Sequence, residues 1–140
     1  MESESRRRSL TVLKAILAAE MLSTAIHYTD NFVAVNRYPG PSDLYTPTRV
    51  AIVVSWPLLT WIGLIGYRRY REGRLHEARV CLAVYSLTGL VTLGHFIYGN
   101  PKIPAFFYAT LFTDALTGLA ALAFALWSAS SAGPQAQAAL

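Results

Sequence analysis

Charged side chains and cysteine are both scarce in this chain of 140 residues. Only 14% of the residues are charged, whereas soluble domains carry about 25%. That deficit, together with 54% hydrophobic residues, argues against a soluble domain and for a lipid environment. The single cysteine, Cys81, excludes an intramolecular disulfide and any cysteine-rich metal or redox motif.

The sequence also lacks the short motifs of common catalytic sites. It has no phosphate-binding loop, no G-x-S-x-G nucleophile motif, no H-E-x-x-H zinc motif and no c-type haem attachment motif. The Glu-x-x-His pattern of di-iron helical bundles is absent as well. We therefore predict no cofactor and assign no metal ligands.

Four long apolar segments, separated by short polar stretches, make up most of the chain. Each has roughly 20 residues, the length that an α-helix needs to cross about 30 Å of hydrocarbon. The predicted spans cover residues 10–28, 48–67, 80–98 and 105–127. Because the loops are short, consecutive helices should be neighbours. We predict an all-α integral membrane protein, an up-down-up-down bundle of four transmembrane helices within residues 1–128, and a disordered tail over 129–140.

The positive charges are unevenly distributed along the chain. Nine of the twelve Lys and Arg residues fall in two groups separated by apolar sequence: Arg6, Arg7, Arg8 and Lys14, then Arg68, Arg69, Arg71, Arg74 and Arg79. This is the distribution of a membrane topology signal and not of a nucleic-acid-binding patch. The positive-inside rule places the N-terminus and the loop between spans two and three in the cytoplasm, so both termini are predicted to be cytoplasmic.

Four ionisable side chains fall inside the predicted spans or at their edges: Glu20, His27, His95 and Asp114. Such residues are costly in a membrane and are candidates for function. At 1.5 Å per residue, Glu20 and Asp114 each lie roughly 12–13 Å below the outer boundary. His27 and His95 lie near the outer ends of their spans. We therefore predict two layers, an outer pair of imidazoles and a deeper pair of carboxyl groups.

Polar residues recur at helical spacing in three of the spans, so each set marks one helix face. Lipid offers no hydrogen bonds, and these faces should meet inside the bundle to form a polar pocket open toward the outer leaflet. We assign acid–base roles to Glu20 and Asp114. The predicted ligand-binding residues are His27, Asp30, Asn31, Trp56, Thr92, His95, Thr110 and Tyr108. Hydroxyl groups in such stripes also commonly bond only to their own helix.

Four functions fit this pattern. The first is a pocket for an apolar or lipid-like molecule, in which a neutral and an ionised carboxyl group could act as acid and base for an isomerase or cyclase without a cofactor. The second is a metal site built from His27, His95 and the carboxylates. The third is proton conduction, and the fourth is a structural subunit of a larger complex or of a homo-oligomer. The sequence leaves open whether there is catalytic turnover.

Two short motifs carry a resemblance to known proteins. The run HYTDNF at 27–32 with YP at 38–39, and GHFIYG at 94–99, resemble those of uncharacterised small four-helix bacterial membrane proteins. This resemblance implies a location in the bacterial inner membrane. The layout is also similar to that of the EXPERA group, which includes the sigma-2 receptor and sterol isomerases. That similarity implies a lipid-binding pocket lined by acidic and aromatic residues, a part that Glu20, Asp30 and Asp114 could play.

Overall fold

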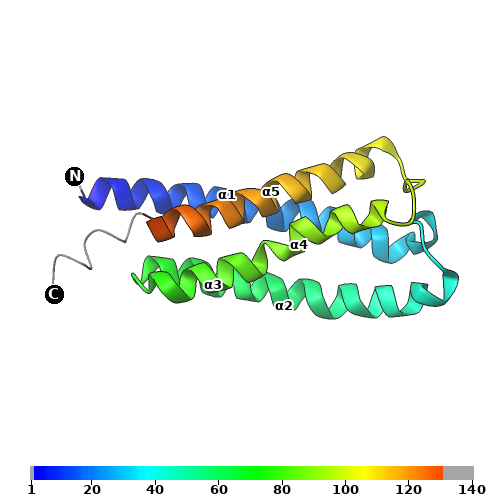
Figure 1. The fold of residues 1–140 in the computed structure, drawn as a ribbon, viewed down its shortest axis with the longest axis horizontal. Coiled ribbons are helices and arrows are strands. Elements are labelled where there is room, and N and C mark those ends of the chain that lie inside the picture. The colour runs from blue at the N-terminus through cyan, green and yellow to red at the C-terminus, as the bar shows by residue number, and fades with distance from the viewer. Residues whose placement is uncertain (1, 131–140) are drawn as a thin grey trace.

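The computed structural model describes residues 2–130, and its long elements are four antiparallel helical spans packed as a bundle (Figure 1). The elements in chain order are α1 (Glu2–Val33), the 3₁₀ turns η1 (Val35–Arg37) and η2 (Ser42–Leu44), α2 (Tyr45–Arg71), α3 (Leu75–Tyr85), α4 (Leu87–Leu90), η3 (Val91–Phe96) and α5 (Ala105–Ser130). α1 packs against α2 and α5, and α3 packs against the same two helices. The predicted all-α, up-down-up-down architecture is confirmed.

Four stretches are long and apolar enough to cross a membrane: Glu4–Val33, Ser42–Arg71, Leu75–Phe96 and Ala105–Ser128. Their outward faces carry large apolar side chains. Leu22, Trp61 and Leu116 are each more than 60% exposed, an arrangement that costs free energy in water and none in hydrocarbon. The chain is therefore a multi-pass membrane protein.

The helices extend beyond the predicted spans. α1 continues to Val33, past the predicted end at residue 28, and α2 begins at Tyr45 and passes through Pro57 without interruption. The predictions counted only apolar residues, but polar residues outside the hydrocarbon can continue a helix. α5 ends at Ser130, so the first two residues of the predicted disordered tail are helical. The remainder of that tail, 131–140, lies outside the described residues.

The third span is not one regular helix. α3 ends at Tyr85, and the chain continues through the short α4 into the 3₁₀ helix η3. Hydroxyl groups at this break bond back to carbonyl oxygens three residues earlier, Ser86 to Ala83 and Thr88 to Tyr85. Such bonds bend helices. These bonds account for the break in the third span, where the sequence predicted one regular α-helix.

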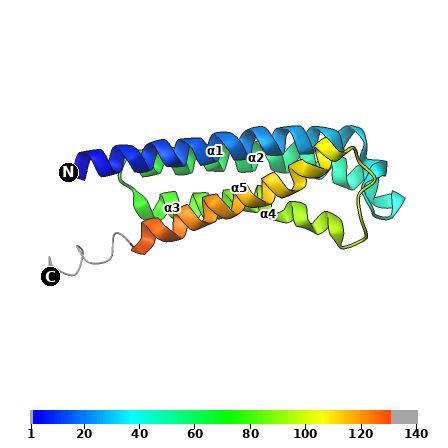
Figure 2. The same cartoon turned by 90° about the horizontal axis from the view of Figure 1, so that it is seen from above.

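Two glycines allow the third span and α5 to cross with their backbones in contact. A Cβ atom on Gly89 would lie 2.1 Å from the carbonyl oxygen of Asp114, and one on Gly118 would lie 2.7 Å from that of Ser86. No side chain fits at either position. Figure 2 shows α5 crossing the third span near α4. This crossing fixes the backbone of Asp114 against the third span.

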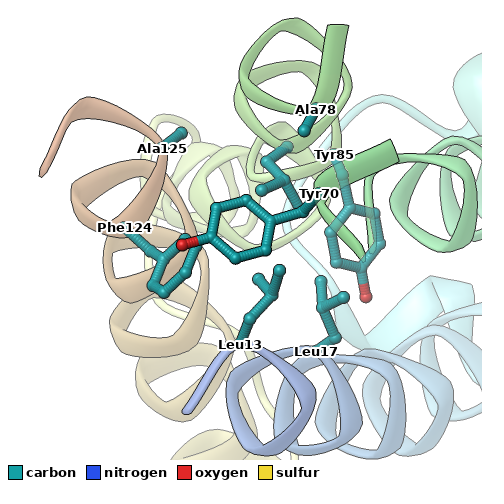
Figure 3. Packing of buried hydrophobic residues seen from close by; sticks show 8 residues of the cluster. Leu13, Leu17, Tyr70, Ala78, Tyr85, Phe124 and Ala125 are labelled. Carbon is teal, nitrogen blue, oxygen red and sulfur yellow. The ribbon is translucent and has the colours of Figure 1, made fainter. Parts of the chain in front are cut away.

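The apolar core lies in the half of the bundle near the N-terminus and the α2–α3 turn (Figures 1 and 3). All four spans contribute to it, and Figure 3 shows Leu13 and Leu17 of α1 facing Tyr70 and Tyr85. Its buried members are Leu13, Leu17, Tyr70, Ala78, Leu82, Tyr85, Phe124 and Ala125. The polar side chains that are buried within the membrane spans gather mainly in the opposite half.

The loops at the far end tie the spans together through the backbone. The N–H of Lys102 donates to the carbonyl oxygen of Arg37 at 2.8 Å, which joins the α1–α2 connection to the loop before α5. The Arg49 side chain donates to the carbonyl of Phe32 at 2.9 Å. These contacts close the polar half of the bundle.

Candidate polar site in the outer half of the bundle

One face of α1 carries a stripe of buried polar residues. Its members recur every three or four positions, so they share one side of the helix. They are Glu20, Thr24, His27, Asp30 and Asn31, all at most 9% exposed. Their partners come from the third span, α5, α2 and the loop after α1. Three layers of contacts result, because the partners lie at three heights along α1.

The middle layer is a direct pair between His27 and Asp114. The Nδ1 atom of His27 lies 2.7 Å from Oδ2 of Asp114, and neither side chain has any exposed surface. The Ser23 hydroxyl donates to the other carboxylate oxygen, Oδ1, and lies 2.6 Å from the Thr113 hydroxyl. Both oxygens of Asp114 therefore have a hydrogen-bond partner.

The deeper layer is built around Glu20. Its Oε1 accepts a hydrogen bond of 3.1 Å from the Thr88 hydroxyl. Its Oε2 is buried and has no hydrogen-bond partner among the described residues. One turn above, the Trp56 indole N–H donates to the Thr24 hydroxyl at 3.1 Å and connects α2 to the stripe.

The outer layer joins the end of α1 to the loop and to the third span. The Tyr38 hydroxyl donates to Oδ2 of Asp30 at 2.9 Å. Burial raises the pKa of Tyr38, which keeps its hydroxyl protonated as a donor. The side-chain amide of Asn31 lies 3.2 Å from Nε2 of His95. Because an amide NH₂ only donates, this contact requires Nε2 of His95 to be unprotonated.

The predicted outer pair of imidazoles is confirmed, because the rings of His27 and His95 lie 5.2 Å apart. The separate deeper layer of carboxyl groups is wrong, because Asp114 contacts His27 and not Glu20. The prediction ended the first helix at residue 28, whereas α1 continues to Val33. His27 thus lies six residues, roughly 9 Å, below the end of its helix. Asp114 lies nine residues into α5, which begins at Ala105. Its height is therefore between those of His27 and Glu20, within reach of the imidazole.

The second ring nitrogen of His27 is open. Its Nε2 atom is buried and has no hydrogen-bond partner among the described residues. The ring lies among three other aromatic rings, with centroid distances of 5.2 Å to His95, 5.2 Å to Tyr28 and 5.8 Å to Tyr38. When Asp114 is ionised and accepts from Nδ1, Nε2 presents a lone pair. In that tautomer the ring has one donor, which Asp114 accepts, and one acceptor without a partner among the described residues.

Two of the predicted ligand-binding residues do not join this network. The Thr110 hydroxyl bonds to the carbonyl of Phe107 in its own helix, which is the alternative role considered for the hydroxyl groups. Tyr108 packs in a separate aromatic group with Phe96 and Phe112. Thr92 does bridge two spans, because its hydroxyl lies 3.2 Å from the Leu111 carbonyl oxygen as well as bonding within its own span.

Several hollows adjoin the site, and two of them are lined by residues of its outer layer. One, of about 170 Å³, is lined by Asn31, Tyr38 and His95 together with the loop residues Pro39 and Gly40. Such a volume is below the roughly 300–1,000 Å³ of pockets that take drug-sized ligands. The other is an open groove of about 640 Å³ between α1 and α5. Its walls are mostly apolar, and its lining residues are Ala25, Ile26, Thr29, Asp30, Val33, Phe106 and Phe107.

The predicted site residues do not include Tyr38 and Ser23, which contact Asp30 and Asp114. Tyr38 lies in the loop after α1 and reaches back eight residues to Asp30, a contact that helical periodicity does not reveal. Ser23 lies one position before Thr24 on α1, but its bond to Asp114 depends on how α1 packs against α5. The Tyr38-Pro39 pair was the available signal, since it belongs to the motif on which the resemblance rests.

The described residues contain no group of three or more His, Cys, Asp or Glu side chains placed to hold a metal ion. His27 and His95 lie side by side, but within the described part of the chain Asp114 is the only carboxylate that hydrogen-bonds to either imidazole. The alternative metal site therefore lacks a third protein ligand in this arrangement.

Comparison with known proteins yields no relative from which a role could be carried over. No protein-family model, curated protein or solved structure matches the chain. Of what the resemblance implied, the structure supports only the coarse part, a four-helix bundle with four helices long and apolar enough to cross a membrane.

Proposed function

We propose that the outer half of the bundle binds the polar part of an apolar or lipid-like molecule, and that His27 and Asp114 transfer protons for it. The setting would be the bacterial inner membrane, with both termini in the cytoplasm and the site in the outer leaflet. The uneven distribution of basic residues supports this orientation. The reaction class that fits best is an isomerisation or cyclisation that needs no cofactor.

The observation that carries the proposal is the His27–Asp114 pair with its open Nε2 atom. A histidine that only stabilised the bundle would be expected to have both ring nitrogens satisfied, since buried polar atoms are nearly always hydrogen-bonded. Here one nitrogen is held by the carboxylate at 2.7 Å and the other has no partner among the described residues. A carboxylate that orients an imidazole while the second nitrogen stays open is the usual geometry of a general base.

The shape of the site limits how a ligand could bind. The 170 Å³ hollow has room for a polar head group only, whereas the groove between α1 and α5 could hold an apolar chain. Asp30 lies at the junction, because it lines the groove and accepts a hydrogen bond from Tyr38, which lines the hollow. Tyr38 also covers His27. Binding would therefore require the Tyr38 side chain to move.

The proposed step is a proton transfer within one molecule. Nε2 of His27 takes a proton from a carbon next to a double bond or carbonyl group, and the imidazolium that forms is stabilised by Asp114. The imidazolium, whose proton exchanges with water, then gives a proton to a different carbon. Substrate and product have the same atoms and the same oxidation level, so no co-reactant is needed. Glu20, with one unpartnered oxygen nearby, is the second candidate acid.

The test is to incubate the protein in nanodiscs of bacterial lipid extract in D₂O and to analyse the lipids by mass spectrometry. We expect deuterium to enter one lipid-like species or a new isomer to appear, and His27→Gln and Asp114→Asn to abolish this. His76→Gln is the matched control, because His76 is exposed. If the wild type neither retains a small molecule nor exchanges deuterium, the proton-transfer role is excluded.

A structural role in a larger complex is the second candidate. The tight Gly89–Gly118 crossing and the contacts of Gly63 and Gly66 with Tyr85 and Leu82 show that small residues serve close packing. These contacts all lie within one chain. Co-purification of a stoichiometric partner protein, with an empty site in the wild type, would favour this role.

A further inference from the structure

A second groove lies at the opposite end of the bundle, near the N-terminus. It runs between the first part of α1 and the last part of α5 and has a volume of about 600 Å³. Its lining residues are Ser5, Arg8, Ser9, Val12, Ile16, Ala120, Ala123, Phe124 and Trp127. It belongs to the basic end, far along the helices from His27 and Asp114, so it is independent of the proposed proton-transfer site.

The lining of this groove changes character along its length. Arg8, Ser5 and Ser9 lie within one turn of α1 and supply a cation and hydroxyl groups, whereas Val12 and Ile16 follow on the same face. On the α5 side the walls are Ala120, Ala123, Phe124 and Trp127. A tryptophan beside the charged end is typical of the membrane–water interface. The groove is therefore charged and polar at one end and apolar along the rest, as a lipid molecule is.

Arg8 is the residue that gives the groove its charge preference. It is exposed and forms no hydrogen bond or ion pair with the described side chains, whereas its neighbour Arg6 donates to the carbonyl of Arg71. No Asp or Glu among the described residues lines the groove. A cation without a partner in the described part of the chain, at the mouth of an apolar groove, is complementary to a phosphate group with an acyl chain attached.

We propose that this groove is a binding site for one anionic phospholipid, whose phosphate contacts Arg8 and whose acyl chain lies along Val12, Ile16 and Ala123. Basic pockets between transmembrane helices bind anionic head groups in this way. A neutral lipid would make the same acyl-chain contacts, so the preference for an anionic lipid comes from Arg8. The bound lipid would also join α1 to α5 at the end where the two helices enter the headgroup region.

The test compares phosphatidylglycerol with phosphatidylcholine of identical acyl chains by native mass spectrometry of the full chain in detergent. A charge near the membrane surface contributes about 1 kcal/mol per Lys or Arg, so wild type should bind phosphatidylglycerol roughly fivefold more tightly. Arg8→Gln should remove this preference. Arg7→Gln is the matched control, because it removes the same charge from the neighbouring position but does not line the groove.

A second variant tests the groove itself. Ala123→Phe places a large side chain in the path of the acyl chain and should weaken the binding of both lipids, while the charge is unchanged. An equal loss of preference in Arg7→Gln and Arg8→Gln would show only general attraction to a basic surface and would overturn the proposal. Unchanged lipid binding in Ala123→Phe would overturn it too.

Discussion

The side chains of His27 and Asp114 are fully buried, so water cannot supply the hydrogen bond that is lost when one of them is removed. Asp114→Ala would leave the His27 Nδ1–H and the Ser23 hydroxyl without their acceptor. We expect a loss of about 1–3 kcal/mol in the free energy of unfolding, the usual cost of a buried donor left unsatisfied. Reversible unfolding in mixed micelles measures it. Thr117→Val is the control, because its hydroxyl bonds only within α5 and its loss should change stability little.

The same pair should be energetically coupled. Because the two side chains are in direct contact and fully buried, the double variant His27→Ala with Asp114→Ala should cost less than the sum of the single variants, by at least about 1 kcal/mol. A double-mutant cycle in the same micelles gives the coupling free energy. Additive effects would mean that the 2.7 Å contact is not maintained in the membrane protein.

Among the elements, the crossing of the third span over α5 has the least tolerance for change. Gly89→Ala would bring a methyl group to within 2.1 Å of the Asp114 carbonyl oxygen, and backbone cannot move aside as a side chain can. We expect a destabilisation of about 3 kcal/mol or failure to fold, measured by unfolding and by the yield of monodisperse protein. Gly94→Ala is the control, since its nearest contact is the end of Ile97 at 4.0 Å.

The loop after α1 should control access to His27. The Tyr38 ring lies 4.7 Å from His95 and 5.8 Å from His27, and it belongs to a loop and not to a helix. In the wild type, diethylpyrocarbonate should modify exposed His76 and leave His27 unmodified. Tyr38→Ala should make His27 reactive, as measured by peptide mass spectrometry. Continued protection of His27 would show that Tyr38 does not cover the site.

The elements differ in how far the sequence could predict them. Hydrophobic length alone predicts four spans, and helical periodicity places Glu20, His27 and Asn31 on one face. The heights of the polar side chains along the bundle, and which of them pair, were not predictable. They follow from the end of α1 at Val33 and the break after Tyr85, which depend on side chain–backbone bonds and on packing. Neither the helix end nor the break can be read from the apolar content of the sequence. The error in the layers of Asp114 and His27 follows from that single misplaced helix end.

The orientation of the whole molecule in the membrane does not follow from the bundle alone, because its helices alternate in direction. The α2–α3 turn lies at the same end as the N-terminus (Figure 1), and the basic residues gather there. Lys and Arg near span ends are retained on the cytoplasmic side during insertion. In a Cys81→Ser background, Ser42→Cys at the far end should react with a membrane-impermeant maleimide on intact cells. His76→Cys, in α3 just after the α2–α3 turn, should react only after permeabilisation. The reverse pattern would place the polar site in the inner leaflet, and the lipid groove at Arg8 would then face the outside.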